Sequence, residues 1–214
     1  DGLEALGMQL VKNIEVGRTE NSYAAQVGQL VSAGATCIVP IIAPGEVAKL
    51  MTATQQSGQK ILIGGVTAAF SQDLLNSLGK SGDGILLAGA NYLPTDTQIP
   101  AVQDMINAMK QYTPQTPPTT TYGTAAWGAA TLLFSSVMPT INGTIDSASV
   151  MTALQNTTNA TVGTYAPYTF AKQPPAAQFP RLRNTGILLW KVQDSMPHLE
   201  SPDFTDIYKT VPLK

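Results

Sequence analysis

Charged residues are scarce in this chain. Of its 214 residues only 12% are charged, and the formal net charge is -2. Lysine and arginine form no cluster, so the chain lacks the basic footprint of a nucleic-acid-binding protein and no nucleic-acid partner is expected. Its polar surface must be built largely from Thr, Ser, Gln and Asn, a composition that favours a secreted protein.

Cysteine and histidine occur once each. Cys37 has no second cysteine to pair with, so the chain forms no internal disulfide. It lies in the apolar run 35–42, and we expect a buried thiol because free cysteines are among the most buried residues. His198 lies in a polar tail, where we expect it to be solvated. One histidine and one cysteine do not make a zinc site, so we expect no metal and no cofactor.

Catalytic motifs and membrane-length apolar runs are also absent. The sequence contains no GxxxxGK[ST], GxGxxG or GxSxG motif, and its carboxylates are scattered rather than paired. We therefore predict that the protein is not an enzyme. No apolar run reaches the ~18–20 residues of a membrane-spanning helix. Asn142, Asn156 and Asn159 fit the glycosylation pattern, a match that we interpret as coincidental.

The first ninety residues alternate between strand-like and helix-like apolar patterns. The predicted strands are residues 8–15, 35–42, 60–66 and 83–90, and the predicted helices are residues 22–33, 44–57 and 71–78. Asn21 or Ser22 is expected to cap the first helix. Short connections between alternating strands and helices predict an α/β fold with a parallel sheet and right-handed crossovers. Residues 35–42 should therefore be buried on both faces of the sheet.

Beyond residue 91 the pattern changes. Residues 91–98 form a polar link and a candidate hinge, and 113–121 a loop. Helices are predicted over residues 99–112, 122–138 and 146–156, the last capped by Asp146 or Ser147. The apolar faces of these three helices need a partner, and no visible strand serves them, so we expect a sheet that this sequence does not contain. Two more strands, 165–170 and 185–193, and a polar end, 197–214, complete the chain.

One passage carries a family resemblance. Residues 23–35, YAAQVGQLVSAGA, resemble the helix-to-strand passage of type I solute-binding proteins, the branched-chain amino-acid-binding components of ABC transporters. The helix 44–58, the strand 60–65 and the segment 122–130, which begins at Tyr122 and contains Trp-Gly-Ala-Ala, are similar in spacing. Family members are roughly twice as long. The resemblance thus implies a two-lobed, parallel-sheet periplasmic-binding-protein-like fold of type I that lacks its N-terminal part.

The resemblance also implies a domain organisation. Residues 1–91 would form most of the second lobe, 92–160 the helical part of the first lobe, and 161–214 the C-terminal crossover and tail. The opening residues 1–7 have no leader sequence and read as the middle of a helix. We therefore expect that processing or truncation has removed a preceding part, which would be a partner of this chain.

The function implied by the resemblance is binding. An extracytoplasmic protein, periplasmic or a cell-surface lipoprotein, would deliver a small organic ligand to the membrane permease of an ABC transporter. Two alternatives remain: a ligand-sensing domain of a receptor or regulator with the same fold, and an α/β enzyme. The enzyme is disfavoured because the predicted strand ends carry Ile, Ala, Pro, Val and Thr rather than an acid, a base and a nucleophile.

Open parallel sheets bind ligands beyond the carboxyl ends of their strands. The predicted ligand-binding residues follow two strands and the hinge, and by resemblance a tyrosine joins them from the other lobe: Ile42, Ala43, Pro44, Thr67, Ala68, Tyr92 and Tyr122. Backbone N–H groups at the helix starts near Pro44 and in 69–71 could receive an anion or a carbonyl. Each residue also has a purely structural interpretation: Pro44 as a helix starter, Thr67 as a cap, and the two tyrosines as packing residues.

Thr67 departs from the amino-acid-binding members of the family, which commonly carry a carboxylate in this loop to hold the ammonium group of the ligand. Here the loop has no acid before Asp73. A buried, unpaired ammonium is costly. The departure favours a neutral or anionic, partly apolar ligand. The expected ligand is a small apolar or aromatic carboxylate, or an amino acid whose ammonium group is held by the absent part.

Overall fold

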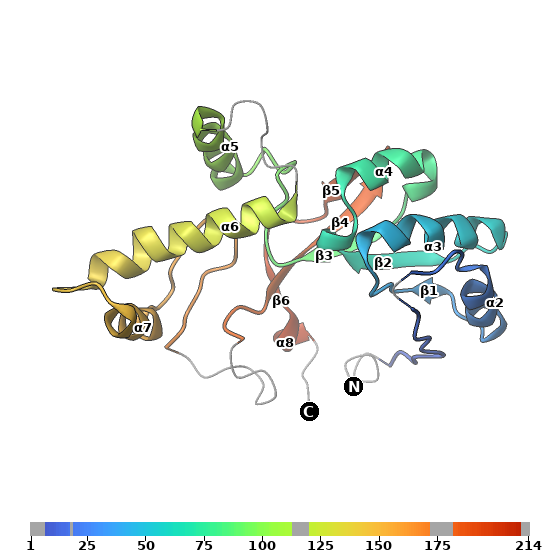
Figure 1. The fold of residues 1–214 in the computed structure, drawn as a ribbon, viewed down its shortest axis with the longest axis horizontal. Helices are drawn as coiled ribbons and strands as arrows, with labels where there is room; N and C mark the ends of the chain where they lie inside the picture. Colours follow the sequence, from blue (N-terminus) through green and yellow to red (C-terminus); the bar gives the residue numbers. More distant parts are fainter. Residues whose placement is uncertain (1–6, 18, 113–119, 172–181, 211–214) are drawn as a thin grey trace. The chain divides into compact units, whose positions relative to one another are not determined.

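The computed structural model describes residues 7–17, 19–112, 120–171 and 182–210 (Figure 1). The chain divides into two compact units. Unit 1 comprises Asp1–Gly89 and Leu189–Ser201, and unit 2 comprises Ala90–Leu188 and Pro202–Lys214. The polypeptide therefore passes between the units three times, twice in the last third of the sequence.

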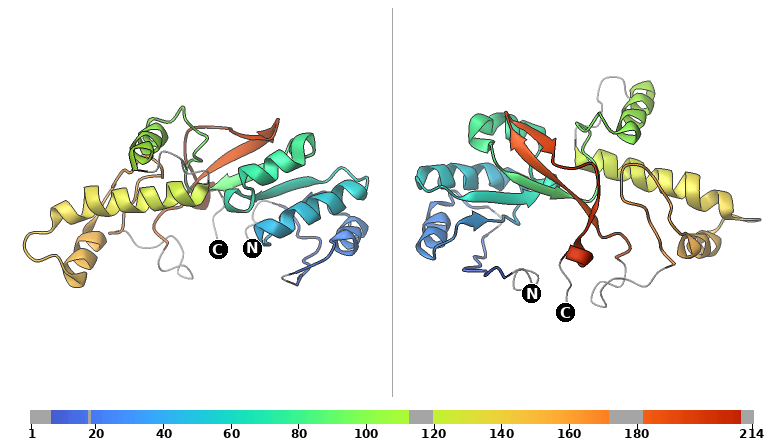
Figure 2. Two further views of the ribbon diagram at one scale, coloured as in Figure 1. Left: turned by 45° about the horizontal axis from the view of Figure 1, so that its top comes forward. Right: turned by 180° about the vertical axis from the view of Figure 1, so that it is seen from behind.

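A mostly parallel sheet forms unit 1. Its strands lie in the order β1 (Cys37–Ile38), β2 (Leu62–Val66), β3 (Leu86–Gly89), β4 (Gly186–Gln193) and β5 (Met196–Leu199). The pairs β1–β2 and β2–β3 are parallel, whereas β4 and β5 form an antiparallel hairpin (Figure 2). Asp194 and Ser195 at its turn both have positive φ, as a tight two-residue hairpin requires. The predicted α/β fold with a parallel sheet is confirmed.

Unit 1 also contains three helices: α2 (Ala24–Ser32) precedes β1, α3 (Pro44–Gln56) lies between β1 and β2, and α4 (Gln72–Leu78) lies between β2 and β3. Pro44 occupies the first turn of α3, as predicted. The predicted position of the cap of α2 is wrong, because the cap residue is Tyr23, without a side-chain hydrogen bond to the helix, although Ser22 Oγ accepts a hydrogen bond from the Ala24 N–H at 3.2 Å. Tyr23 is instead buried, and its hydroxyl donates to Glu46, which fixes the point where the helix begins.

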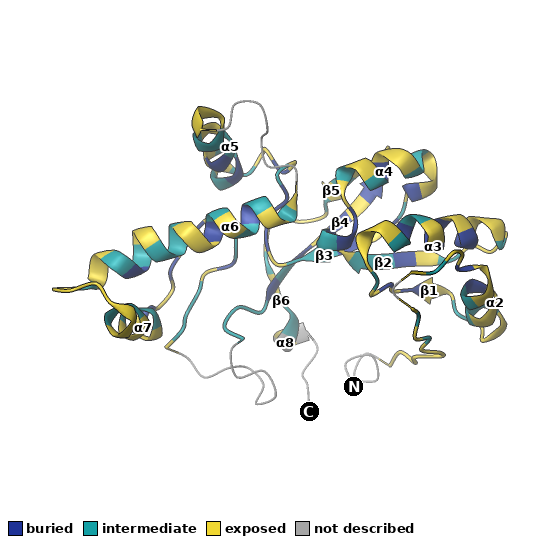
Figure 3. Cartoon of the chain, viewed as in Figure 1, coloured by how far each residue is buried: buried dark blue, intermediate teal, exposed yellow. Residues whose placement is uncertain are grey.

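The core of unit 1 lies on one face of the sheet. Ile38, Ile63 and Leu87 are buried there, with Val47 and Leu50 of α3. The residues that alternate with them point to the opposite face and are exposed: Cys37, Val39, Leu62, Val66 and Leu86. Figure 3 colours each element by how far its residues are buried. The prediction that residues 35–42 are buried on both faces, with a buried Cys37 thiol, is wrong. The reason is that no described element covers this second face.

Residues 8–15 were also expected to form a strand, and this prediction is wrong. The structure describes them, and they have no regular secondary structure. Their apolar and polar residues alternate as in a half-buried strand, but a strand needs a neighbour to share its hydrogen bonds. Among the described residues no strand pairs with them.

Unit 2 is mainly helical. It contains α5 (Pro100–Tyr112), α6 (Thr121–Thr131) with its wider π-type extension η3 (Leu132–Val137), α7 (Ser147–Asn156), β6 (Thr205–Asp206) and α8 (Ile207–Thr210). The three predicted helices are confirmed, and Asp146 caps α7 in a reciprocal pair with Ser149. The predicted loop 113–121 lies mostly outside the described residues. These helices bury few residues: two on α5, two on α6 and none on α7. The expected additional sheet stays a prediction.

One prediction about the tail is wrong. Residues 165–170 form no strand; Tyr165 and Tyr168 make isolated bridges to Asn91 and Ala160, and the Tyr168 ring stacks on Phe170 at 5.6 Å. The polar end of the chain, for which no element was predicted, contains most of β5 and all of β6 and α8. His198 belongs to β5, where Lys191 of β4 is its partner, and it remains exposed. Pairing with β4 explains how these polar residues become ordered.

Candidate functional site

Five of the seven predicted ligand-binding residues share one edge of unit 1. Because β1, β2 and β3 run parallel, the segments that follow them leave the sheet at the same edge. Ile42, Ala43 and Pro44 follow β1, and Thr67 and Ala68 lie in η1 (Thr67–Ala69), directly after β2. The helix that starts at Pro44 contacts η1, so the two loops are neighbours.

The loop after β2 is tightly packed. Thr67 is buried, and a Cβ at Gly89 would lie 2.7 Å from its Oγ1 and 3.3 Å from the Trp190 ring. A Cβ at Gly65 would overlap the ring of Phe70. The glycines therefore make room for the side chains that hold this loop. Ala68 stays half-buried, and Ala43 and Pro44 are exposed. The loops thus offer a small, mostly apolar surface on a rigid support.

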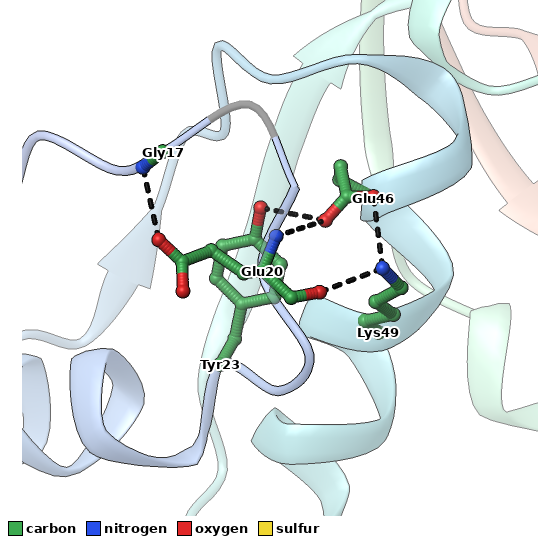
Figure 4. Close-up of polar contacts among 5 residues, drawn as sticks. All are labelled: Gly17, Glu20, Tyr23, Glu46 and Lys49. Carbon is green, nitrogen blue, oxygen red and sulfur yellow. Dashed lines mark hydrogen bonds and ion pairs between the residues drawn. The ribbon is translucent and has the colours of Figure 1, made fainter.

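A polar cluster holds the beginning of α3 (Figure 4). Oε2 of Glu46 accepts hydrogen bonds from the Tyr23 hydroxyl at 3.1 Å and from the Glu20 backbone N–H at 3.3 Å. Lys49 donates to Oε1 of Glu46 at 2.9 Å and to the Glu20 carbonyl at 2.6 Å. The cluster ties the segment before α2 to the first turn of α3, next to the predicted site residue Pro44.

The electrostatics of this cluster follow from its hydrogen bonds. The hydrogen bond from Lys49 is the main cause that lowers the pKa of Glu46, and Tyr23 acts in the same direction. Burial and the nearby Glu46 raise the pKa of Tyr23. An ionised Glu46 in the first turn of α3 is also favoured by the helix dipole. Sequence reasoning missed this cluster, although Glu46 and Lys49, spaced three apart just after Pro44, were a visible signal.

The two remaining candidates lie in unit 2. Tyr92 is buried; its hydroxyl donates to the Pro202 carbonyl, and its ring meets Phe204 edge-on at 5.1 Å. Burial raises its pKa. Tyr122, in the first turn of α6, is 65% exposed. Asn91, which sequence reasoning did not single out as a site residue, donates to Oγ1 of Thr121 at 3.1 Å and fixes the start of α6 beside Tyr92.

The described residues bring together no group of three or more His, Cys, Asp or Glu side chains able to hold a metal ion. None of the described helices has the length and hydrophobicity of a membrane span.

The sequence matches the family model described as periplasmic binding protein over residues 1–178. The chain therefore belongs to the periplasmic binding protein family. This is a family of solute-binding proteins rather than enzymes, and it implies an extracytoplasmic location. A comparison with curated protein sequences finds no match to this chain.

Solved structures show the same fold. A branched-chain amino acid ABC transporter protein from Thermus thermophilus with bound valine is 18% identical with a TM-score of 0.75; the match covers 97% of this chain and 56% of that one. A leucine-binding protein from Thermotoga maritima is 15% identical (TM-score 0.65; 89% and 51% covered). A fatty acid ABC transporter substrate-binding protein from Thermomonospora curvata is 19% identical (TM-score 0.71; 92% and 51% covered).

These likenesses confirm the type I periplasmic-binding-protein fold. The chain spans a little over half the length of the solved structures that it matches. Nearly half of each of those structures has no counterpart here.

Proposed function

We propose that this chain is part of an extracytoplasmic solute-binding protein, periplasmic or a cell-surface lipoprotein, that presents a small organic ligand to the membrane permease of an ABC transporter. One observation supports this proposal above the others. The chain belongs to the periplasmic binding protein family, and the loops after β1 and β2 lie side by side at the carboxyl edge of its parallel sheet. These loops expose small apolar residues, whereas Thr67 is packed inward.

In this proposal unit 1 is most of the second lobe and unit 2 contributes to the first. As predicted from the sequence, residues 1–91 are assigned to the second lobe, 92–160 to the first lobe and 161–214 to the C-terminal crossover and tail. The remainder of the first lobe is supplied by a part of the protein outside these 214 residues. Binding closes the lobes because the ligand contacts both of them only in the closed state. Residues 91–98 would serve as one hinge strand.

The ligand class follows from the residues at the edge. Val66 and Ala68 offer apolar surface, and the loop 66–70 carries no carboxylate, so a cationic group is not neutralised there. We therefore propose a small apolar or aromatic carboxylate, or an amino acid whose ammonium group is held by the part outside this chain. The related structures include proteins for valine, leucine and fatty acids, ligands that all combine a carboxylate with an apolar body.

The two tyrosines have different parts in this proposal. Tyr122 is exposed at the start of α6 and offers its ring to the ligand. Tyr92 is buried in unit 2, where it contacts Pro202 and Phe204. In this proposal it packs against these residues and positions the hinge segment 91–98 rather than contacting the ligand.

Tyr122→Ala in the complete protein should weaken ligand binding about tenfold, because a truncated aromatic contact typically costs more than 1 kcal/mol of binding free energy. Calorimetric titration with leucine, benzoate and octanoate would measure the dissociation constants. Tyr112→Ala is the matched control, since Tyr112 is also an exposed tyrosine of unit 2. Equal affinities of Tyr122→Ala and the wild type would remove Tyr122 from the site. No binding of any probe class by the wild-type protein would contradict the proposed ligands.

A further inference from the structure

The connection between η4 (Met138–Thr140) and α7 carries an exposed asparagine followed by a glycine. Residues 141–146 belong to no helix or strand, and Asn142 and Gly143 are both exposed. In Figure 1 this segment makes the turn between the end of α6 and α7. Gly143 has a positive φ of 107°, and a Cβ there would meet nothing within 4 Å. The backbone at this turn therefore has both the conformational freedom and the space to rearrange.

The backbone nitrogen of Gly143 is also available for reaction. Its N–H donates no hydrogen bond to any of the described residues. The chain has nine asparagines, and Asn142 alone among them is followed by glycine. A backbone nitrogen in this position can reach the amide carbon of the preceding asparagine, because the two atoms close a five-membered ring. A side chain on the second residue hinders this approach, and glycine has none.

Two other exposed asparagines of unit 2 lack this freedom. Asn156 and Asn159 are exposed to a similar degree. The N–H that follows Asn156 belongs to Thr157 and donates to a carbonyl of α7 at 3.1 Å. The N–H that follows Asn159 belongs to Ala160 and donates to the Tyr168 carbonyl at 2.8 Å. Both nitrogens are thus held by the fold, and reaction at either must await local opening.

We propose that Asn142 is a site of non-enzymatic modification, at which the side-chain amide is converted to a carboxylate through a cyclic imide. The Gly143 backbone nitrogen gives up its proton to solvent base and attacks Cγ of Asn142. A new C–N bond forms, and the side-chain nitrogen leaves as ammonia. Water then opens the ring at either of its two carbonyls, which yields aspartate or iso-aspartate at this position. Water is the one co-reactant that the conversion needs.

The modification changes the charge in front of α7. The product adds one negative charge to a chain whose net charge is -2, four residues before Asp146, the cap of α7. The beginning of α7 is held separately, because Ser149 pairs with Asp146 and donates to the Thr144 carbonyl at 3.0 Å. The new charge therefore appears on a turn that lies outside the contacts that fix the helix. Time and pH control its appearance.

The test uses the complete protein, aged at physiological pH and temperature and then digested with pepsin in acid, where the reaction is slow. Mass spectrometry of the peptide that contains Asn142 should show a gain of about one mass unit, because an NH2 group is replaced by OH. The converted fraction should grow with time, at a rate proportional to hydroxide concentration. Asn156 and Asn159 in the same samples should convert at least about tenfold more slowly, because their following nitrogens are held.

Two variants separate the contribution of the fold from that of the sequence. Gly143→Ala should slow conversion of Asn142 about tenfold, since a Cβ hinders the attack and disfavours the positive φ. Ala160→Gly is the matched control, because it gives Asn159 a following glycine whose N–H still faces the Tyr168 carbonyl. Asn159 should then stay slow in the folded protein and convert as fast as Asn142 in urea, where the hydrogen bond is lost.

Three results would overturn the proposal. The first is conversion of Asn142 in the complete protein no faster than that of Asn159. The second is an equal rate at Asn142 and at Asn159 of folded Ala160→Gly, since the fold would then have no effect. The third is a rate that does not rise with pH. Ligand binding enters none of these measurements, so the proposed function stands or falls separately.

Discussion

At the scale of single residues, the carboxylate of Glu46 links two segments of unit 1, the one that leads into α2 and the first turn of α3. It accepts from Tyr23 at the start of α2 and from Lys49 within α3, while Glu20 adds a backbone donor. The cluster fixes the first turn of α3 directly after the loop that carries Ala43 and Pro44. A change at Glu46 should therefore affect the stability of this corner of unit 1.

The pH dependence of this corner follows from the direction of the pKa shift. The folded-state pKa of Glu46 lies below its ordinary value of 4.5, chiefly through the Lys49 hydrogen bond. Its contribution to stability is therefore present above that value and is lost as the pH falls through the folded-state pKa. Glu46→Gln should lower the melting temperature at neutral pH, and the difference from wild type should shrink below pH 4.5. A difference that is independent of pH, measured by thermal melts across that range, would contradict this account.

Gly89 and Thr67 form a second residue-scale contact, at the proposed binding edge. Gly89→Ala places a methyl group 2.7 Å from Thr67 Oγ1, so we expect a loss of about 1–3 kcal/mol of unfolding free energy. Adding Thr67→Ala should recover part of this loss, because the smaller side chain removes the clash. Urea denaturation of both single variants and of the double variant would measure the coupling. Additive losses would show that Gly89 and Thr67 do not meet.

At the scale of elements, the sheet of unit 1 has a buried face and an open face. The adjacent residues Leu86 and Leu87 lie on opposite faces and so allow the two to be compared. Leu87 is 1% exposed and Leu86 is 40% exposed. Leu87→Ala should cost about 2–5 kcal/mol of unfolding free energy, because it leaves a cavity in the core. Leu86→Ala in the same chain should cost less than about 1 kcal/mol, since little apolar area is lost from the interior. Similar losses, measured by urea denaturation, would mean that the open face is covered.

The helices were predictable from sequence, whereas the outer strands were not. α3 and α7 carry their own signals, Pro44 in the first turn and Asp146 at the cap, and the structure confirms both. Residues 8–15 and 165–170 have strand-like patterns but form no strand, because pairing depends on a neighbour that local sequence does not specify. The hairpin β4–β5 was half missed because residues 196–199 are few, contain Pro197, and form a strand only through their pairing with β4.

At the scale of the whole molecule, the fold could be predicted because the order of strands and helices leaves few arrangements. The family resemblance seen at residues 23–35 is confirmed by the match over residues 1–178. The burial of individual residues could not be predicted from the sequence. Cys37 was placed in a core from the apolar run around it, yet its face of the sheet is open among the described residues. The apolar pattern shows that a residue is suited to burial, but it does not show which element, if any, packs over that residue.

The two tryptophans give the molecule a built-in spectroscopic probe in each unit. Trp190, fully buried, belongs to unit 1, and Trp127, half-buried on α6, belongs to unit 2. A buried indole emits at shorter wavelength than one that meets water, so each ring reports its own surroundings. With Trp127→Phe the fluorescence follows unit 1, and with Trp190→Phe it follows unit 2. Denaturation curves of the two variants therefore reveal whether the halves of this protein melt as one body or as two.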